Sequence, residues 1–547
     1  NEESIEIAKL SLWLRTAQKG RKLNRLNNNI KCGNSLIDDP EVVGEKAFNW
    51  QNEFPEIFAN GGFDVVIGNP PYVNINTMPE IHEFLKNKYT EIHTGYNDLM
   101  YYFLFKGIDI LKTSGLYGVI TSNYFIGNDY ADKLRLFLNK HVETIVNFEK
   151  TLVFEDANVH TTLVFAKKET HNKLMQFYTY TANNPLRMVD LSLGYTFCEL
   201  ERNKQSNKWL IANNQNQNII DKIHIDATLL NEICEIEKGS TSGKNSIFTI
   251  SYEFAENQYL EKELLRKNVK NGDIDSYTFT ERGFYLIYTD NNTNMDDYPK
   301  ISSYLNQFKE ELSSRNEASK GLYSWFRLER PRNKQLFDSP EKLIVPYRAT
   351  RNRFAYDNQQ FFNDGGDIRI LALKQDVQFS IKYLLPLLNS KLLDWFYGFI
   401  GKAKGNAREY FNKPLSEIPI KNIPLKDQQA FILLADTMLK FKTELKQKRN
   451  RFLKRLTDNF NIDKINSGIQ NFADNDFKTL LKELSKLKIQ LSLSQQDEWE
   501  DYFNTYKSEI NQLQSEIEKT VNEIDRMVYE LYGLTDKEIR IVEGTKA

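Results

Sequence analysis

The chain has 547 residues, of which 40% are hydrophobic and 27% are charged, and these proportions exclude a disordered or fibrous protein. Its 72 basic and 74 acidic residues nearly cancel, so the net charge of -2 does not by itself indicate a polyanionic partner. No apolar run reaches the roughly 18 residues of a membrane helix, and the three cysteines show neither a disulfide nor a zinc pattern. Because the start also lacks the features of a signal peptide, we expect a cytoplasmic protein of several domains that does not contact a membrane.

The first residues predict a helix, because Ile5, Ala8, Leu12 and Leu14 follow a roughly helical spacing behind an acidic first turn. The chain also lacks an initiator methionine. We therefore expect that it starts inside a longer polypeptide.

Residues 1–195 alternate short β-branched runs with helical stretches, a pattern typical of an α/β domain with a largely parallel sheet. A helix is expected from Leu99 to Leu111. The expected strands are Phe63–Gly68, Leu116–Ile120, Thr144–Phe148 and Thr162–Phe165.

Two further domains are expected after residue 195. Residues 196–425 show short apolar runs broken by Asn, Gly and Pro, which predicts a second, mixed α/β domain. In residues 426–547 one proline-free helical pattern follows another, so we expect a helical hairpin or bundle there. The polar run Asn213–Asn218 is typical of a linker or surface loop.

The residues that carry chemistry are Asn69, Pro70, Pro71 and Tyr72, which directly follow the expected strand ending at Gly68. Ligands of open α/β folds bind at the carboxyl ends of strands, where two prolines fix an extended loop. The Asn69 amide oxygen and the Pro70 carbonyl can hold the protons of an exocyclic amine during its methylation, and the Tyr72 ring offers a stacking face. The four letters alone also fit an ordinary Pro-Pro turn, so the surrounding sequence decides.

In that context, Phe63–Asn74 resembles motif IV of amino-methyltransferases of the adenine-N6 subgroup, in which the Asn-Pro-Pro-Tyr residues are catalytic. The segment from residue 29 to 36 resembles motif III, which contacts the adenine ring of S-adenosylmethionine. The resemblance implies Asn34 and Ser35, with Asn69, as cofactor-binding residues. Many relatives have Asp at the position of Asn34; an amide can still bond to the cofactor amine, and a loop asparagine is the alternative.

Two later segments extend the resemblance. Leu116–Phe125 is similar to the motif VI strand and the loop after it, which we expect to be structural. Val153-Phe154 followed by His160–Phe165 resembles the motif VIII region, where an aromatic residue sandwiches the flipped adenine against the motif IV tyrosine. This implies a base-stacking pair of Tyr72 and Phe154, with a core phenylalanine as the alternative.

The family's cofactor site opens with a Gly-rich loop and an acidic residue that binds the ribose, and both precede the helix that residues 1–14 resemble. The resemblance therefore implies a truncated Rossmann-like class I methyltransferase domain that needs a missing N-terminal segment of the same protein. We expect this chain alone to be inactive. Any nuclease, with its Mg²⁺, would lie upstream.

Residues 237–248 resemble the opening of the TaqI-like specificity domain found in enzymes that combine adenine methylation with restriction, and later segments recur in the same order. Independently, residues 315–353 hold ten basic and four acidic side chains interleaved with aromatics, which is typical of a DNA-binding face. A solvated charged face is the alternative at any single position. The DNA-binding residues predicted here are Lys238, Ser240, Asn245, Arg327, Arg330, Arg332, Arg348, Arg351 and Arg353.

Taken together, the sequence is identified as the C-terminal portion of an Eco57I-like, type IIG restriction-modification protein. The resemblance implies a monomeric, site-specific DNA adenine-N6 methyltransferase that flips its target out of double-stranded DNA. The alternative is a non-catalytic, sequence-specific DNA-binding module. A third hypothesis, methylation of RNA or protein amides by a related enzyme, is disfavoured by the large specificity region.

Overall fold

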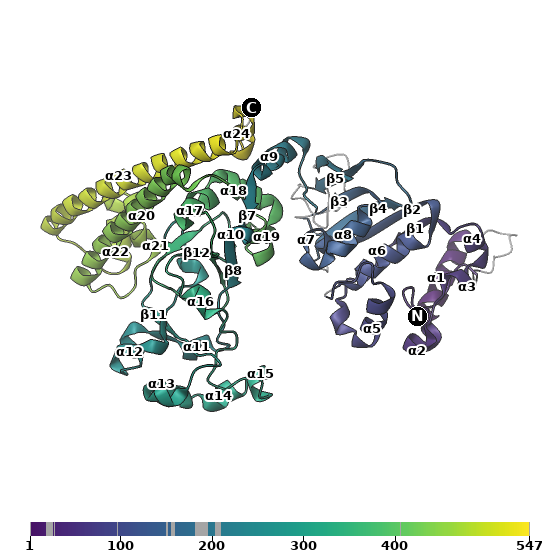
Figure 1. Cartoon of the computed structure of the whole chain (residues 1–547), viewed down its shortest axis with the longest axis horizontal. Helices are drawn as coiled ribbons and strands as arrows, with labels where there is room; N and C mark the ends of the chain where they lie inside the picture. Colours follow the sequence, from purple (N-terminus) through teal and green to yellow (C-terminus); the bar gives the residue numbers. More distant parts are fainter. Residues whose placement is uncertain are drawn as a thin grey trace. The chain divides into compact units, whose positions relative to one another are not determined.

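The computed structural model describes residues 2–17, 26, 28–95, 97–148, 151–154, 159–180, 195–202, 209–404 and 406–545. The chain divides into two compact units, Asn1–Gln217 and Asn218–Ala547, drawn in Figure 1. The domain boundaries expected at residues 195 and 425 remain predictions. Among the described residues, no helix combines the length and the apolar character that crossing a membrane requires.

The first unit is built on one six-stranded sheet with the order β1-β2-β4-β3-β5-β6. Every strand and the helix expected from the sequence in this unit are present. The strand expected at Leu116–Ile120 begins five residues earlier, at Leu111, where the helix was expected to end, and the other ends differ by at most two residues. The strands are β1 (Phe63–Gly68), β2 (Leu111–Ser122), β3 (Val142–Asn147), β4 (Thr161–Lys167), β5 (Leu174–Tyr180) and β6 (Tyr195–Glu201). The helices are α1 (Glu2–Thr16), α2 (Pro40–Val43), α3 (Trp50–Glu53), α4 (Pro55–Ala59), α5 (Pro79–Lys88), α6 (Leu99–Asp109), α7 (Tyr124–Gly127) and α8 (Asp132–Leu138).

The sheet is mixed, which corrects the expectation that it would be largely parallel. Only the β1–β2 and β3–β5 pairs are parallel, because β4 lies antiparallel between β2 and β3 and β6 runs antiparallel beside β5. Strands β1, β2, β3 and β5 nevertheless point the same way. A run of β-branched residues predicts a strand but does not encode its direction, so the sequence could not distinguish the two arrangements.

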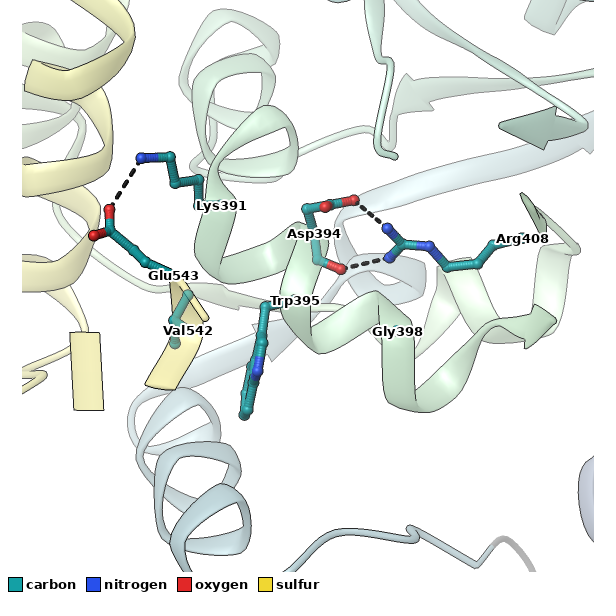
Figure 2. Close-up of a pocket in the computed structure, with 7 residues that line it drawn as sticks. All are labelled: Lys391, Asp394, Trp395, Gly398, Arg408, Val542 and Glu543. Carbon is teal, nitrogen blue, oxygen red and sulfur yellow. Dashed lines mark hydrogen bonds and ion pairs between the residues drawn. The ribbon is translucent and has the colours of Figure 1, made fainter. Parts of the chain in front are cut away.

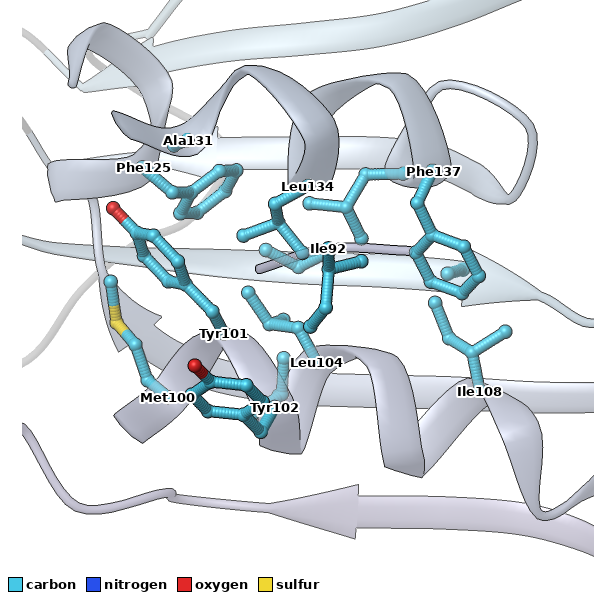
Figure 3. Packing of buried hydrophobic residues seen from close by; sticks show 14 of the residues in the cluster. Ile92, Met100, Tyr101, Tyr102, Leu104, Ile108, Phe125, Ala131, Leu134 and Phe137 are labelled. Carbon is cyan, nitrogen blue, oxygen red and sulfur yellow. The ribbon is translucent and has the colours of Figure 1, made fainter. Parts of the chain in front are cut away.

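Helices α6 and α8 pack on one face of this sheet and form its core with the strands. Figure 3 shows Tyr101, Leu104 and Ile108 of α6 meeting Leu134 and Phe137 of α8. All of these side chains are buried. The apolar spacing of both helices therefore fixes the layer that holds β1 and β2 in place.

The segment before β1 packs through aromatic rings against the start of that strand. Trp50 lies 5.6 Å from Phe63 in edge-to-face geometry, and its indole nitrogen donates to the Ser35 carbonyl at 2.9 Å. A Cβ at Gly33 would overlap the Phe48 ring, so glycine is required there. Helix α1 forms as expected, but none of its described residues is buried.

A linker or surface loop was expected at residues 213–218. The boundary between the two compact units does fall in this run, after Gln217, but the residues form the start of helix α9 (Asn214–His224) and not a loop. Asn213 accepts a hydrogen bond from the Asn216 amide at 2.8 Å, which caps the helix start. Ile219, Ile220 and Ile223 are buried. The polar run is therefore the exposed first turn of an amphipathic helix.

The second unit begins with several small sheets and short helices. Its four-stranded antiparallel sheet has the order β14-β12-β15-β8. The strands are β7 (Ala227–Leu229), β8 (Cys234–Lys238), β9 (Thr249–Ser251), β10 (Leu265–Lys267), β11 (Phe284–Ile287), β12 (Lys342–Pro346), β13 (Arg348–Ala349), β14 (Ala355–Asp357), β15 (Ile368–Leu373), β16 (Lys402–Lys404), β17 (Ala407–Glu409) and β18 (Pro419–Lys421). The short helices are α10 (Leu230–Ile233), α11 (Asn245–Phe248), α12 (Tyr252–Asn257), α13 (Pro299–Asn306), α14 (Lys309–Ser313), α15 (Asn316–Ser319), α16 (Lys334–Phe337), α17 (Ile381–Asn389), α18 (Lys391–Ile400) and α19 (Asn412–Ser416).

The C-terminal residues form the expected helical hairpin. The long helices α20 (Leu425–Phe460) and α23 (Leu493–Leu531) pack against each other, and the hairpin tip is closed by α21 (Ser467–Gln470) and α22 (Phe477–Lys486). Phe452 of α20 stacks on Phe472 and contacts Phe503 of α23, which fixes the tip. The short helix α24 (Asp536–Val542) follows.

Candidate functional site

The loop Asn69-Pro70-Pro71-Tyr72 follows the carboxyl end of β1 without a break. Pro70 is buried, whereas Asn69 is exposed and Tyr72 is half-buried. The Tyr72 hydroxyl donates a hydrogen bond to the Asn69 side-chain oxygen at 3.1 Å. Burial raises the pKa of Tyr72 above its usual value of 10.0, so its hydroxyl stays protonated and remains a donor at neutral pH. The loop thus presents an amide oxygen beside an aromatic ring.

Residues 97–99 form hydrogen bonds with the segment that follows this loop. The Leu99 amide donates to the Val73 carbonyl at 2.8 Å, and the Ile75 amide donates to the Asn97 carbonyl at 3.3 Å. The Asn74 side chain also donates to an Asp98 carboxylate oxygen at 3.4 Å. Residues 97–99 therefore hold the segment that directly follows Tyr72.

Asp98 was not predicted as a site residue. Burial raises the pKa of its carboxyl group, and the hydrogen bond from Asn74 partly opposes this shift. Its position immediately before the apolar run of α6 was the available signal, because Asp is favoured at the start of a helix. That signal indicates a helix cap and not a contact with a loop 24 residues away.

The neighbouring strands also end in polar side chains at this edge of the sheet. Asn123, just after β2, donates from its side-chain nitrogen to the Asn147 side-chain oxygen at the end of β3, at 3.0 Å. Since β1, β2 and β3 point the same way, their carboxyl ends meet at one edge. This is where open α/β sheets bind ligands.

The predicted cofactor residues Asn34 and Ser35 lie in a tight turn. The Asn34 side-chain oxygen accepts a hydrogen bond from the Leu36 amide at 3.1 Å, and its backbone amide donates to the Lys46 carbonyl at 2.6 Å. The carbonyl of Ser35 is the acceptor of the Trp50 indole. A carbonyl oxygen has two lone pairs, so the Asn34 side chain retains one acceptor site as well as its own two donors.

Phe154, predicted as the second stacking ring, lies in the short described segment 151–154 and is half-buried. No ring contact within the described residues joins it to Tyr72. Its stacking role stays a prediction.

Ser240 of the second unit, predicted to bind DNA, is buried, and its hydroxyl and carbonyl form hydrogen bonds within the protein. Its hydroxyl donates to the Asn363 carbonyl, and its own carbonyl accepts from the amides of Gly365 and Gly366 at 3.0 and 2.9 Å. The Asn245 side chain is exposed and donates to the Asp364 carbonyl at 3.3 Å. These contacts fold the segment after β8 against the segment before β15.

The predicted arginines divide into two groups. Arg330 makes a bidentate ion pair with Glu317, with both contacts at 2.6 Å, and Arg348 pairs with Glu409 at 2.7 Å. The other predicted arginines form no ion pair within the part of the chain that the structure covers. These arginines are Arg327, Arg332, Arg351 and Arg353.

Two other basic residues of this stretch are structural. Arg315 is buried and donates to several backbone carbonyls, including that of Ser242 at 2.5 Å. Lys342 is fully buried and pairs with the equally buried Asp357 at 2.7 Å. The excess of positive charge counted in the sequence is therefore not all available to a ligand.

A pocket of about 360 Å³ lies elsewhere in the second unit (Figure 2). Its charged groups already neutralise one another, because Lys391 pairs with Glu543 at 3.0 Å and Arg408 with Asp394 at 2.9 Å. None of the predicted site residues lines it. Neither this pocket nor any other part of the described chain gathers three His, Cys, Asp or Glu side chains suited to a metal ion. The lining residues are Lys391, Asp394, Trp395, Gly398, Arg408, Val542 and Glu543.

Three regions of the chain match known protein families. Residues 1–154 match the family described as Eco57I restriction-modification methylase, and residues 267–420 match the TaqI-like C-terminal specificity domain. Residues 424–528 match a domain of unknown function, DUF8810. The first match contains the Asn69–Tyr72 loop, and the second contains all six predicted arginines.

The chain is also similar to individual restriction-modification enzymes and methyltransferases. The chain is 28% identical over 456 residues to the type II restriction enzyme and methyltransferase RM.Eco57I of Escherichia coli, covering 74% of this chain and 44% of that protein. It is 26% identical over 417 residues to the type II methyltransferase M.HincII of Haemophilus influenzae, covering 73% and 82%. The chain thus spans less than half of the first relative.

Among solved structures, the fold resembles the type IIL restriction-modification enzyme MmeI in complex with DNA. The TM-score is 0.52 at 13% identity, covering 88% of this chain and 56% of that one. At this identity the likeness supports the fold alone.

Proposed function

We propose that this chain, which joins an Eco57I-type restriction-modification methylase region to a TaqI-like C-terminal specificity domain, is the base-accepting and DNA-recognising part of a DNA adenine-N6 methyltransferase. The observation that carries the proposal is the Asn69–Tyr72 loop at the carboxyl end of β1, with the Asn69 side-chain oxygen held by the Tyr72 hydroxyl at 3.1 Å.

In this proposal the loop holds an adenine amine. The Asn69 side-chain oxygen and the Pro70 carbonyl accept hydrogen bonds from the two N–H groups of the amine, so that the nitrogen lone pair turns away from the ring and toward the methyl donor. When it is bound, S-adenosylmethionine supplies the electrophilic methyl group. The proton that the amine loses passes to water, because neither acceptor is a strong base.

The target base must leave the duplex to reach this loop. Tyr72 is half-buried, with a ring next to the acceptor, and supports stacking of an extruded adenine. Phe154 is proposed as the opposite face of the sandwich. Stacking on two rings offsets the few kcal/mol that unstacking a base costs, at about 1–3 kcal/mol per base.

The residues proposed to hold S-adenosylmethionine are Asn34, Ser35 and Asn69. Asn34 fits an adenine ring, because its remaining acceptor site and its free amide group match an exocyclic amine beside a ring nitrogen. The aromatic contacts of Trp50 hold the Ser35 turn rigid. These residues cover the adenine end of the cofactor only.

We also propose that an upstream segment of the same polypeptide completes the sheet at β1. Among the described residues no strand pairs with the outer edge of β1, where Val65 and Ile67 are 56% and 80% exposed. Leu116 and Phe165, on neighbouring strands, are 47% and 44% exposed. An exposed apolar sheet face beside an open edge is unfavourable in water, so these side chains support a covering layer that carries the rest of the cofactor site. Without it the chain is proposed to be inactive.

The proposed substrate is double-stranded DNA, bound by a monomer in the cytoplasm. Support comes from the arginines that lack a carboxylate partner and from their place in the TaqI-like region. Mg²⁺ is proposed only for a nuclease domain upstream, if the parent protein has one.

The test is the identity of the methylated product. The upstream-extended protein would be incubated with labelled S-adenosylmethionine and, in parallel, with unmethylated duplex DNA, structured RNA and mixed protein. We expect label in DNA, recovered as N6-methyladenine after digestion to nucleosides. Label in RNA or protein would refute the DNA assignment, and a folded, cofactor-binding protein that labels nothing would favour a non-catalytic DNA-binding module.

A further inference from the structure

Three basic side chains of the second unit lie close together without a carboxylate partner. Lys238 of β8 and Arg369 of β15 are direct cross-strand partners in the antiparallel sheet. Residues in this relationship point to the same face, with Cβ atoms about 5 Å apart. Arg332 follows Arg330, which exchanges backbone hydrogen bonds with Thr241 beside the same turn, and its charge lowers the pKa of both Lys238 and Arg369.

Arg369 was not predicted from the sequence, and it is the most constrained of the three. It is only 3% exposed. One guanidinium nitrogen, Nη1, donates to the Ile368 carbonyl at 2.8 Å and more weakly to the Gly366 carbonyl at 3.4 Å, and the guanidinium lies 5.1 Å from the centre of the Tyr347 ring. Its Nε is buried and has no hydrogen-bond partner, and the same holds for Arg332 Nε.

This arrangement is unfavourable in the free protein. Like charges directly opposite each other destabilise a sheet, and none of the three forms an ion pair with any residue that the structure describes. Burial is the main cause of the lowered pKa of Lys238 and of Arg369, and the neighbouring cations add to it. At Arg369 the shift is opposed by Tyr347 and Tyr397 and, as the smallest contribution, by Glu237.

A tight glycine turn packs against the Lys238 side chain. Gly366 has φ of +65°, and a Cβ there would lie 2.8 Å from Lys238 Cε and 3.1 Å from Thr241 Oγ1. The positive φ favours glycine here, and a larger residue would also displace the end of the Lys238 side chain. The turn itself is fixed, because the Gly365 and Gly366 amides both donate to the Ser240 carbonyl.

We propose that Lys238, Arg332 and Arg369 form a prebuilt anion site that binds one phosphate of the DNA backbone. The inference rests on the proposed recognition of duplex DNA and assigns it a defined contact point. A phosphate neutralises the repulsion among the three cations, because it offers a negative charge and several strong acceptors. A base edge suits the site less, since it presents no net charge to offset three cations.

The test measures duplex-DNA binding by the whole chain at several salt concentrations, with two duplexes of unrelated sequence. The variants are Lys238→Gln, Arg332→Gln and Arg369→Gln. Each should weaken binding roughly tenfold at low salt and reduce the slope of log Kd against log salt, with a loss of about 1 for the whole phosphate contact. The loss should be the same for both duplexes, because a phosphate carries no sequence information.

Lys334→Gln is the matched control, because Lys334 lies two residues from Arg332 and is already paired with Asp338 at 2.5 Å. Its salt slope should not change. Thermal unfolding checks that each variant folds, and Arg369→Lys keeps the charge if Arg369→Gln does not fold. Inorganic phosphate should raise the Tm of the wild-type chain more than that of Lys238→Gln.

Three results would overturn the proposal. Folded variants could keep the wild-type salt slope, the loss could be confined to one duplex sequence, or free phosphate could stabilise the wild type while DNA binding did not change in any variant. A failure of the proposed methylation is a separate result, because DNA binding and its salt slope do not depend on methyl transfer.

Discussion

The Tyr72 hydroxyl donates a hydrogen bond to the Asn69 side-chain oxygen at 3.1 Å, so the acceptor proposed for the target amine is already occupied in the absence of substrate. The contact orients the Asn69 amide so that its oxygen faces the Tyr72 hydroxyl. An incoming amine proton must replace the hydroxyl or share the oxygen with it, which two lone pairs allow.

The ring and the hydroxyl of Tyr72 should contribute differently to the rate of methylation. Tyr72→Phe keeps the stacking ring and loses only the donor, so we expect methylation by the extended protein to fall less than tenfold. Tyr72→Ala loses the ring, and kcat/KM should fall by about tenfold to a hundredfold, as expected for about 1–3 kcal/mol of stacking. Steady-state kinetics on duplex DNA distinguish the two. Equal losses in both variants would contradict a stacking role.

The open edge of β1 should bind a hydrophobic dye. The given chain should raise the fluorescence of 8-anilinonaphthalenesulfonate, and the upstream-extended protein should not, because the apolar face around Val65 and Ile67 is then covered. Ile67→Asp should destabilise the extended protein by about 2–3 kcal/mol and leave the shorter chain nearly unchanged. Urea unfolding of both proteins measures this. Equal effects in the two would argue that nothing covers β1.

Asp98 should make the first unit less stable as pH rises. Its pKa in the folded state is raised above 3.8, so the folded state binds more protons than the unfolded state between the two values. Stability is therefore lost as pH rises through this window and is fully present below it. Asp98→Asn should remove this loss, since an amide oxygen still accepts from Asn74. A stability–pH curve with the same slope in both proteins would contradict the assignment.

The buried pair of Lys342 and Asp357 should be structural and play no part in DNA binding. Lys342→Met leaves a buried carboxylate without its cation and should cost about 3–5 kcal/mol. Lys342→Met with Asp357→Leu should recover only part of the loss, because the Asp357 carboxylate also accepts from the Gln359 and Phe361 amides. Denaturant unfolding gives both values. The salt dependence of DNA binding by the double variant should equal that of the wild type. A reduced slope would place Lys342 among the phosphate contacts.

The sequence predicted the elements that repeat a simple pattern. The strand at Phe63–Gly68, the helix beginning at Leu99 and the long C-terminal helices follow directly from apolar spacing. Strand direction in the sheet could not be predicted, because β4 enters between β2 and β3 without a signal in its residues. The Asn-rich run was predicted as a loop, because the buried face of α9 begins only at Ile219.

In the candidate site, the sequence could predict only residues that are adjacent in the chain and that together carry the expected chemistry. Asn69–Tyr72 stands out because four adjacent residues carry both the turn and the acceptors. Asp98 and Arg369 act through contacts distant in sequence, with Asn74 and with Lys238, and no local pattern marks such pairs. The basic stretch was counted correctly, but charge counting cannot separate a paired Arg330 from an Arg332 without a carboxylate partner.

The central claim is that Asn69 accepts the target amine. The direct measurement is N6-methyladenine formed per enzyme on unmethylated duplex DNA by the upstream-extended protein, its Asn69→Ala variant and a matched Asn60→Ala control. Asn60 is an exposed asparagine of the same unit whose side chain donates only to the Glu56 carbonyl. We predict a loss of at least about a hundredfold for Asn69→Ala with wild-type Tm, and no change for Asn60→Ala. Unreduced methylation by a folded Asn69→Ala protein would contradict the account.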